Sequence, residues 1–174
     1  MKTKNPLLLF NSRNRSYACD LIWIREVLRR PSIRIVDGAP PIVRGLIHLR
    51  GQILTAIDLE ARLGLPAEEP HPENRCLVFK TSAELLALPD PPPDATQASS
   101  DLVGILVDNT SDIVPPGTTI LPPPPGELSG IDPICVRGVI PIKDNLVTVL
   151  ETSALFNNQK QPTPQKPKLL ALQS

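Results

Sequence analysis

The chain has few side chains of the types that carry out catalysis. His48 and His71 are the only histidines, and neither lies near an acid or nucleophile pattern that would make it a general acid or base. Cys19, Cys76 and Cys135 are far apart, lie among apolar residues and include no CxxC pair. This spacing argues against a zinc site or a disulfide framework and predicts buried thiols in a reducing compartment. We therefore expect no enzyme, no metal and no cofactor.

Two Arg-Gly pairs, Arg44-Gly45 and Arg50-Gly51, flank a short apolar run. Glycine permits tight turns and close backbone approach at each end of that run. Each arginine places a rigid fork of donors beside such a turn, where it can bind carbonyl groups or a carboxylate. This pattern indicates a surface that holds another protein.

Composition bounds the remaining possibilities. The 174 residues suffice for one ordinary domain or two very small ones that share a core. Eighteen basic residues balance eighteen acidic ones, and aromatic residues are scarce, so nucleic-acid binding and an anionic-membrane anchor have little support. The apolar run near the N-terminus is too short for a signal peptide or a membrane span, so we expect a cytoplasmic protein without direct membrane insertion.

Short apolar segments and turn residues predict an all-β chain, either a sandwich or small barrels. Residues 21–28 are compatible with a short helix or with a helical turn followed by a strand. Residues 89–101 are too rich in proline for a packed strand or a helix, and Pro122–Pro125 indicates a stiff spacer or a polyproline ligand. Residues 157–174 are predicted to be disordered, although the apolar stretch at 169–172 could dock on a surface. Hairpins are expected from 7–10 with 17–22, 45–49 with 52–57, and 136–142 with 146–150, and single strands over 76–80 and 103–108.

Three stretches of the sequence resemble the CheW-like domain of bacterial chemotaxis coupling proteins. Residues 17–28 (YACDLIWIREVL) are similar to the second strand of that family and its V-x-E-V element. Residues 39–65 are similar to its P-x-x-x-x-G-x-x-x-L-R-G-x-x-x-P-x-x-D-L signature, with His48 and Thr55 as departures from the pattern. Residues 103–114 (VGILVDNTSDIV) resemble its V-G-x-x-V-D-x-V-x-x-V strand pair.

The resemblance implies two intertwined five-stranded SH3-like barrels over residues 7–156. The first barrel would span roughly 17–65 and the second roughly 75–145, with the termini completing both. It also implies a non-enzymatic adaptor for a chemotaxis or motility array at the membrane. A groove between the barrels would receive the cytoplasmic tip of a methyl-accepting chemoreceptor, and another surface would dock the regulatory domain of a CheA-type histidine kinase. The alternative is a divergent scaffold that binds other proteins and couples no kinase.

The resemblance also assigns roles to five residues. Arg50 and Glu26 match family positions that contact a partner, while a turn arginine and a solvated strand glutamate are the plain alternatives. Ile24, Val27 and Val107 could line the groove, although a place in the buried core is favoured for each.

Five further residues are expected to act through the backbone. Asp58 is predicted to cap a short helix over residues 59–63, and Asp108 to bond into the turn that follows it. Gly45, Gly51 and Gly104 are predicted to permit turns or close backbone approach.

Overall fold

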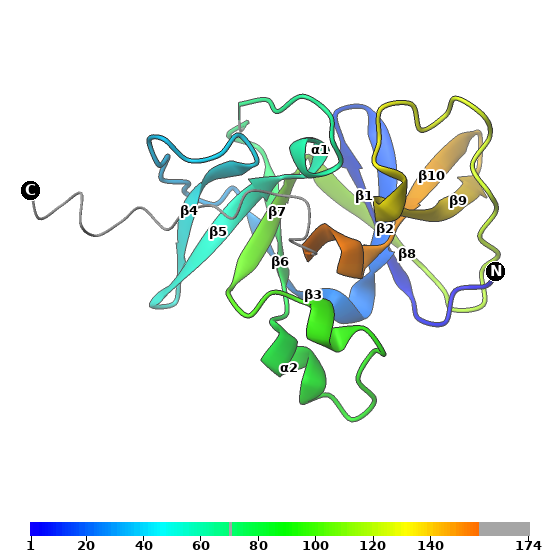
Figure 1. The fold of residues 1–174 in the computed structure, drawn as a ribbon, viewed down its shortest axis with the longest axis horizontal. Helices are drawn as coiled ribbons and strands as arrows, with labels where there is room; N and C mark the ends of the chain where they lie inside the picture. Colours follow the sequence, from blue (N-terminus) through cyan, green and yellow to red (C-terminus); the bar gives the residue numbers. More distant parts are fainter. Residues whose placement is uncertain (70, 157–174) are drawn as a thin grey trace, which may run out of the picture.

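The strands form two five-stranded sheets in the computed structural model, which describes residues 1–69 and 71–156 (Figure 1). Sheet one has the strand order β8-β1-β2-β10-β9 and sheet two the order β3-β6-β7-β5-β4. Sheet one contains β1 (Leu7–Ser12), β2 (Arg15–Asp20), β8 (Asn109–Val114), β9 (Val136–Ile142) and β10 (Asn145–Leu150). Sheet two contains β3 (Ile24–Arg29), β4 (Val43–Leu49), β5 (Gln52–Asp58), β6 (Arg75–Phe79) and β7 (Val103–Val107).

Helices are short, and most of them lie next to the end of a strand. The two α-helices are α1 (Leu59–Arg62) and α2 (Ser82–Leu86), and the 3-10 helices are η1 (Leu21–Trp23), η2 (Ala95–Gln97), η3 (Pro133–Cys135) and η4 (Thr152–Phe156). Within the described residues, every helix is too short to cross a membrane. The all-β prediction is confirmed, and residues 21–28 adopt the second alternative, a helical turn followed by a strand.

The sheets divide the chain differently from the two barrels expected from the sequence. Sheet one combines residues 7–20 with 109–114 and 136–150, so its strands come from both ends of the chain. Residues 103–114 do not form a strand pair, because β7 belongs to sheet two and β8 to sheet one. Two parallel pairings, β2 with β10 and β5 with β7, join segments that are distant in sequence. Turn residues fix hairpins locally, whereas these pairings depend on the shared core.

In each sheet, a segment of the chain crosses one strand close to a glycine, and the two glycines occupy equivalent positions. In sheet two, Arg34 forms a β-bridge to Leu46, next to Gly45; in sheet one, Leu121 bridges Val139, next to Gly138. A Cβ on either glycine would overlap the crossing backbone. The two sites share the sequence Val-Arg-Gly-(Leu/Val)-Ile, at residues 43–47 and 136–140.

The equivalence extends to an ion pair. Arg44 contacts Asp58 at the end of β5 at 3.5 Å, and Arg137 contacts Glu151 just after β10 at 3.0 Å. The two arginines precede their carboxylates by the same number of residues. The chain therefore contains an internal repeat in which an arginine ties the start of a hairpin to its end.

The largest core lies between the sheets. Trp23, Tyr17 and Phe10 are fully buried there, together with Leu59 of α1 and Leu155 of η4. Each sheet also has a smaller apolar cluster, formed mainly by its own side chains. The two sheets consequently share one core and form one domain.

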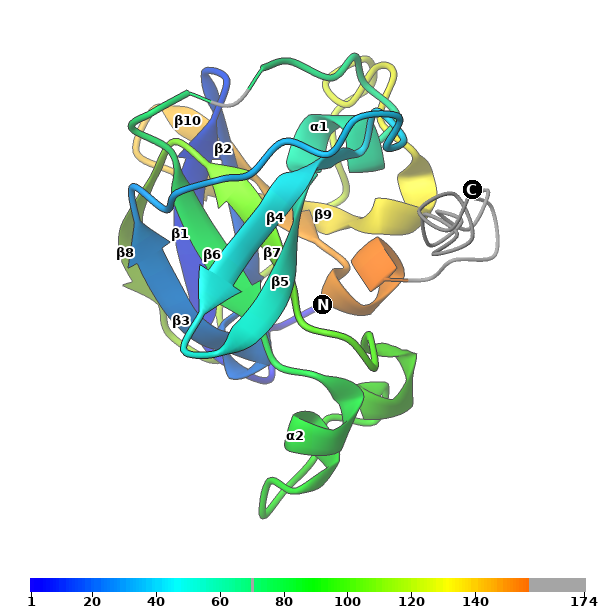
Figure 2. The ribbon, with the colours of Figure 1, turned by 90° about the vertical axis from the view of Figure 1, so that its left-hand side faces the viewer.

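Residues 81–101 form an excursion from sheet two between β6 and β7 that projects from the body of the molecule (Figures 1 and 2). Thr81 and Glu84 form a reciprocal capping box at the start of α2. Leu85, Ala95 and Ala98 anchor the excursion in the main core. The proline-rich part therefore carries a 3-10 turn and buried alanines, where the sequence predicted only an unpacked connection.

Candidate functional site

The structure brings Glu26 and Arg50 together at one end of sheet two. Arg50 lies in the two-residue turn between β4 and β5, where it and Gly51 have φ values of +47° and +79°, as a type I′ turn requires. Its guanidinium donates two hydrogen bonds to the Glu26 carboxylate, Nη1 to Oε1 at 3.1 Å and Nη2 to Oε2 at 2.8 Å. The Arg50 side chain is 70% exposed and that of Glu26 is 23% exposed. The pair is therefore preformed and accessible.

The three apolar residues predicted to line a groove have different positions. Ile24 and Val107 belong to the main core and are 9% and 1% exposed, so they offer little surface to a partner. Val27 is half-buried and packs against the edge of that core. Of these three, Val27 has the most surface and lies next to Glu26 in β3.

The residues predicted to shape the backbone occupy distinct places. Gly51 lies in the β4–β5 turn with open space around it, while Gly45 and Gly104 lie against other parts of the chain. The Asp58 carboxylate accepts a hydrogen bond from the backbone N–H of Ala61 at 2.9 Å and so caps α1. Gly64, with a φ of +94°, follows the end of α1.

Asp108 does not bond into the turn that follows it. Its Oδ2 accepts from the backbone N–H of Arg13 at 2.9 Å, and its Oδ1 accepts from Nδ2 of Asn74 at 3.2 Å. Asp108 sits where the chain passes from β7 in one sheet to β8 in the other, so its carboxylate meets groups from both. The local pattern that suggested a turn contact could not reveal these distant donors.

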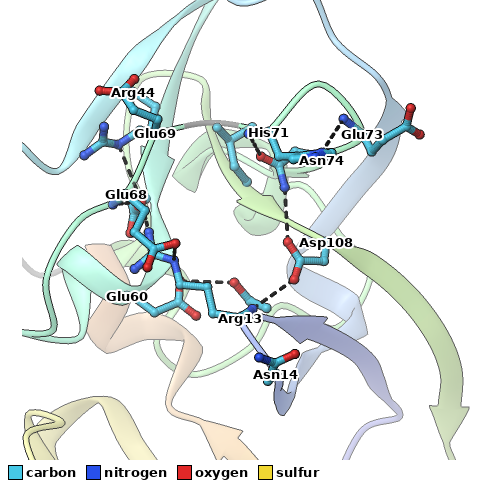
Figure 3. Close-up of a pocket in the computed structure, with 13 residues that line it drawn as sticks. Arg13, Asn14, Arg44, Glu60, Glu68, Glu69, His71, Glu73, Asn74 and Asp108 are labelled. Atoms are coloured by element: carbon cyan, nitrogen blue, oxygen red, sulfur yellow. Dashed lines mark hydrogen bonds and ion pairs between the residues drawn. The ribbon is translucent and has the colours of Figure 1, made fainter.

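A polar cleft of about 540 Å³ lies beside α1, between loops of the two sheets (Figure 3). Arg13, from the β1–β2 turn, binds the Asp58 carboxylate at 2.6 Å, the Pro66 carbonyl oxygen at 2.6 Å and the Glu68 carboxylate at 3.2 Å. Arg44 approaches Asp58 from β4. The cleft is a network of ion pairs that ties sheet one to α1 and the loop after it.

Glu60 is the most deeply buried carboxylate of this network. It accepts hydrogen bonds from the Ser12 hydroxyl at 3.1 Å and the Tyr17 hydroxyl at 3.4 Å, and burial raises its pKa above the ordinary 4.5. Because the folded pKa is raised, the folded state favours the protonated acid. The stability that this group contributes is present below pH 4.5 and is lost as the pH rises through the folded pKa.

We therefore expect Glu60→Gln, which keeps the shape and one acceptor oxygen, to raise the urea midpoint at pH 7. The gain should shrink toward pH 4, where the wild-type side chain binds its own proton. Urea titrations of both proteins at the two pH values measure this difference. An equal gain at both pH values would show that the protonation of Glu60 is not its source, and a loss at pH 7 would show that the ionised form is the better fit.

The two histidines and the three cysteines lie in different elements or loops of the structure. His48 is exposed on β4, and the Nδ1 of His71 accepts the Glu73 backbone N–H at 3.1 Å. The three cysteines are free and buried, and burial raises the pKa of each thiol, to about 12 for Cys76. Within residues 1–69 and 71–156, no three His, Cys, Asp or Glu side chains gather in a way that could hold a metal ion.

Sequence reasoning missed Arg13, Glu60 and the pairing between Glu26 and Arg50. Arg13 and Asn14 carry the positive φ values of a tight turn, and the Asn-Ser-Arg-Asn run at residues 11–14, in a predicted hairpin loop, could have indicated one. The internal Val-Arg-Gly repeat was also readable from the sequence. The ion pair between Glu26 and Arg50 had no signal in the local sequence, because one residue lies in β3 and the other in the β4–β5 turn.

Comparisons with known proteins agree with this fold. The chain is 26% identical over 155 residues to a chemotaxis protein CheW of Rhizobium meliloti (strain 1021), covering 89% of both chains. It is 21% identical to the chemotaxis protein CheW of Bacillus subtilis (strain 168), covering 91% of both. The crystal structure of the scaffolding protein TtCheW from Thermoanaerobacter tengcongensis superimposes with a TM-score of 0.63 at 23% identity, over 87% of this chain and 90% of that one. The family model for the CheW-like domain matches residues 6–160, which include all ten strands, and the chain therefore belongs to the CheW-like domain family.

Proposed function

We propose that the protein is a non-enzymatic adaptor in a chemotaxis or motility signalling array. The observation that carries this proposal is the match of the CheW-like family model to residues 6–160. Relatives that align over most of their own length are chemotaxis proteins named CheW. The adaptor would bridge the cytoplasmic tip of a methyl-accepting chemoreceptor and the regulatory domain of a CheA-type histidine kinase, in the cytoplasm at membrane-associated arrays.

The exposed Glu26–Arg50 pair is the best-formed candidate for one of these contacts. An exposed ion pair contributes about 0–1 kcal/mol to folding, so a partner can exchange its bonds at little cost to the fold. Val27, the next residue of β3, is half-buried and packs against the main core, to which Ile24 and Val107 belong. Each contact can be modest, because an array keeps the next partner at a high effective concentration.

We expect Glu26→Lys and Arg50→Glu each to weaken binding of one array partner by about tenfold or more, with little change in melting temperature, because rim charges act on association more than on folding. Isothermal titration with the receptor fragment and with the kinase regulatory domain measures this. Lys143→Glu is a matched control, since Lys143 is also an exposed cation with positive φ (+54°), in the hairpin turn of the other sheet. If Glu26→Lys and Arg50→Glu lower the melting temperature strongly, the pair is structural.

The adaptor role itself is tested by assembling the three proteins. Purified chain, kinase regulatory domain and receptor fragment should co-elute as a ternary complex in size-exclusion chromatography, and omission of the chain should separate the other two. If the chain binds neither partner at micromolar concentration, the adaptor role is wrong and the divergent scaffold is the better description.

A further inference from the structure

A second surface of sheet two combines an open strand edge, an apolar floor and positive charge. It is a groove of about 540 Å³ between the outer edges of β3 and β4, here called the seam. Leu28, Ile33 and Leu46 supply apolar lining, and Arg29, Arg34 and His48 supply basic groups. The seam ends near the Glu26–Arg50 pair, because Leu49 of its lining is the last residue of β4 and Arg50 follows it in the turn.

The backbone of β4 is open along part of the seam. Leu46 exchanges two hydrogen bonds of 2.8 Å with Arg34, which closes one end. Outward-facing backbone groups recur every second residue of an antiparallel strand, so His48 presents its N–H and C=O to the same side. Among described residues, none outside the β4–β5 ladder makes a backbone hydrogen bond with His48. One outward-facing residue of β4 is therefore ready to pair with an added chain.

The charge of the seam has one sign. Arg29, Arg34 and His48 are exposed, and the lining includes no aspartate or glutamate. Neither Arg29 nor Arg34 forms an ion pair with any residue that the structure describes. A ligand with acidic side chains would meet guanidinium groups that pair with no described carboxylate, and each of these can bind a carboxylate through two parallel hydrogen bonds.

We propose that the seam docks an extended, acidic segment of a partner protein, which pairs with β4 at His48. Strand addition supplies backbone hydrogen bonds, alternate apolar side chains enter the lining, and the acidic side chains meet Arg29 and Arg34. This inference rests on the proposed adaptor function, because it names the chemistry of one array partner. Residues 157–174 of the chain itself carry three lysines and no acidic residue, so their charge disfavours them as the occupant.

Three short fluorescent peptides test the proposal in anisotropy titrations. The first alternates valine and glutamate, the second replaces the glutamates by lysine, and the third is the acidic peptide with N-methylated backbone amides. The acidic peptide is expected to bind, the lysine peptide not to bind, and the methylated peptide to bind about tenfold more weakly because it lacks the strand donors. Amide shifts in NMR spectra should concentrate at residues 32–34 and 46–49.

Variants of the protein separate charge from position. The double variant Arg29→Glu/Arg34→Glu should bind the acidic peptide at least about tenfold more weakly, whereas Arg15→Glu/Lys143→Glu, with the same change of net charge on sheet one, should bind it normally. Equal loss in both double variants, equal binding of the methylated peptide, or amide shifts elsewhere would overturn the proposal, as would self-association of the chain through this edge.

The outcomes also distinguish this inference from the adaptor role. If the kinase domain and receptor fragment bind the Arg29→Glu/Arg34→Glu variant normally and the acidic peptide does not bind the wild type, the seam proposal fails and the adaptor role stands. If the peptide binds the seam while neither array protein binds the chain, the seam is supported and the adaptor role fails.

Discussion

Replacement of Gly45 by alanine is expected to lower the free energy of unfolding by about 3 kcal/mol or more, through the combined cost of overpacking and an unfavourable φ. Gly45 has a φ of +153°, and a Cβ there would overlap the carbonyl oxygen of Arg34 and lie 2.6 Å from Cγ2 of Ile33. Both contacts belong to the segment that closes sheet two. The backbone bridge between Arg34 and Leu46 would have to move, and urea denaturation should show the loss directly.

Gly38→Ala is the matched control for this change. Gly38 also has a positive φ, +75°, but a Cβ there would meet nothing within 4 Å. Its replacement should cost about 1 kcal/mol, which is the backbone cost alone. If the two variants are equally stable, the segment at Ile33 and Arg34 can move away from residue 45 without cost, and the closure of sheet two does not depend on glycine.

Asp58→Ala should cost about 3–5 kcal/mol, the range for removing one partner of a buried charge network. Asp58 is 6% exposed and serves four groups at once: the backbone N–H groups of Ala61 and Glu68, and the guanidinium groups of Arg13 and Arg44. Its removal leaves both arginines, which are themselves mostly buried, without this carboxylate and takes the cap from α1. Urea unfolding monitored by the fluorescence of Trp23 measures the change.

Two further variants separate the contributions of Asp58. Asp58→Asn keeps an oxygen for the Ala61 N–H, so it should retain the cap and lose only the charge. Thr81→Ala removes a helix cap from the peripheral α2 and should cost about 1 kcal/mol. If Asp58→Ala costs no more than Thr81→Ala, capping accounts for the whole role of Asp58 and the ion pairs add nothing to stability.

Local signals in the sequence predicted most elements of the fold. The hairpins at residues 45–57 and 136–150 follow from alternating apolar segments around turn residues, and the cap at Asp58 from its place before a short apolar helix. The order of strands was not predictable in this way, because β2–β10 and β5–β7 pair segments from distant parts of the chain. Helix α2 was overlooked although Thr81 and Glu84 have the spacing of a capping box, because the prolines that follow dominated the pattern.

The candidate site was predictable in part. Glu26 and Arg50 were singled out separately, but only the fold shows that they bind each other across sheet two. Ile24 and Val107 were expected to line a groove or the core, and their burial follows from the position of β3 and β7 against sheet one. An apolar residue in a strand does not reveal which face another sheet will cover.

The intertwined sheets have a consequence for the order in which the chain can fold during its synthesis. Sheet two has all its strands once residue 107 has left the ribosome, whereas β1 and β2, which emerge first, must wait for β8, β9 and β10. Until then, the apolar side chains of the first hairpin lack their neighbours in sheet one. Long-range pairing of this kind is slow and exposes aggregation-prone edges. The hairpin of β1 and β2 thus precedes every other strand in the chain, yet its sheet is the last to be completed.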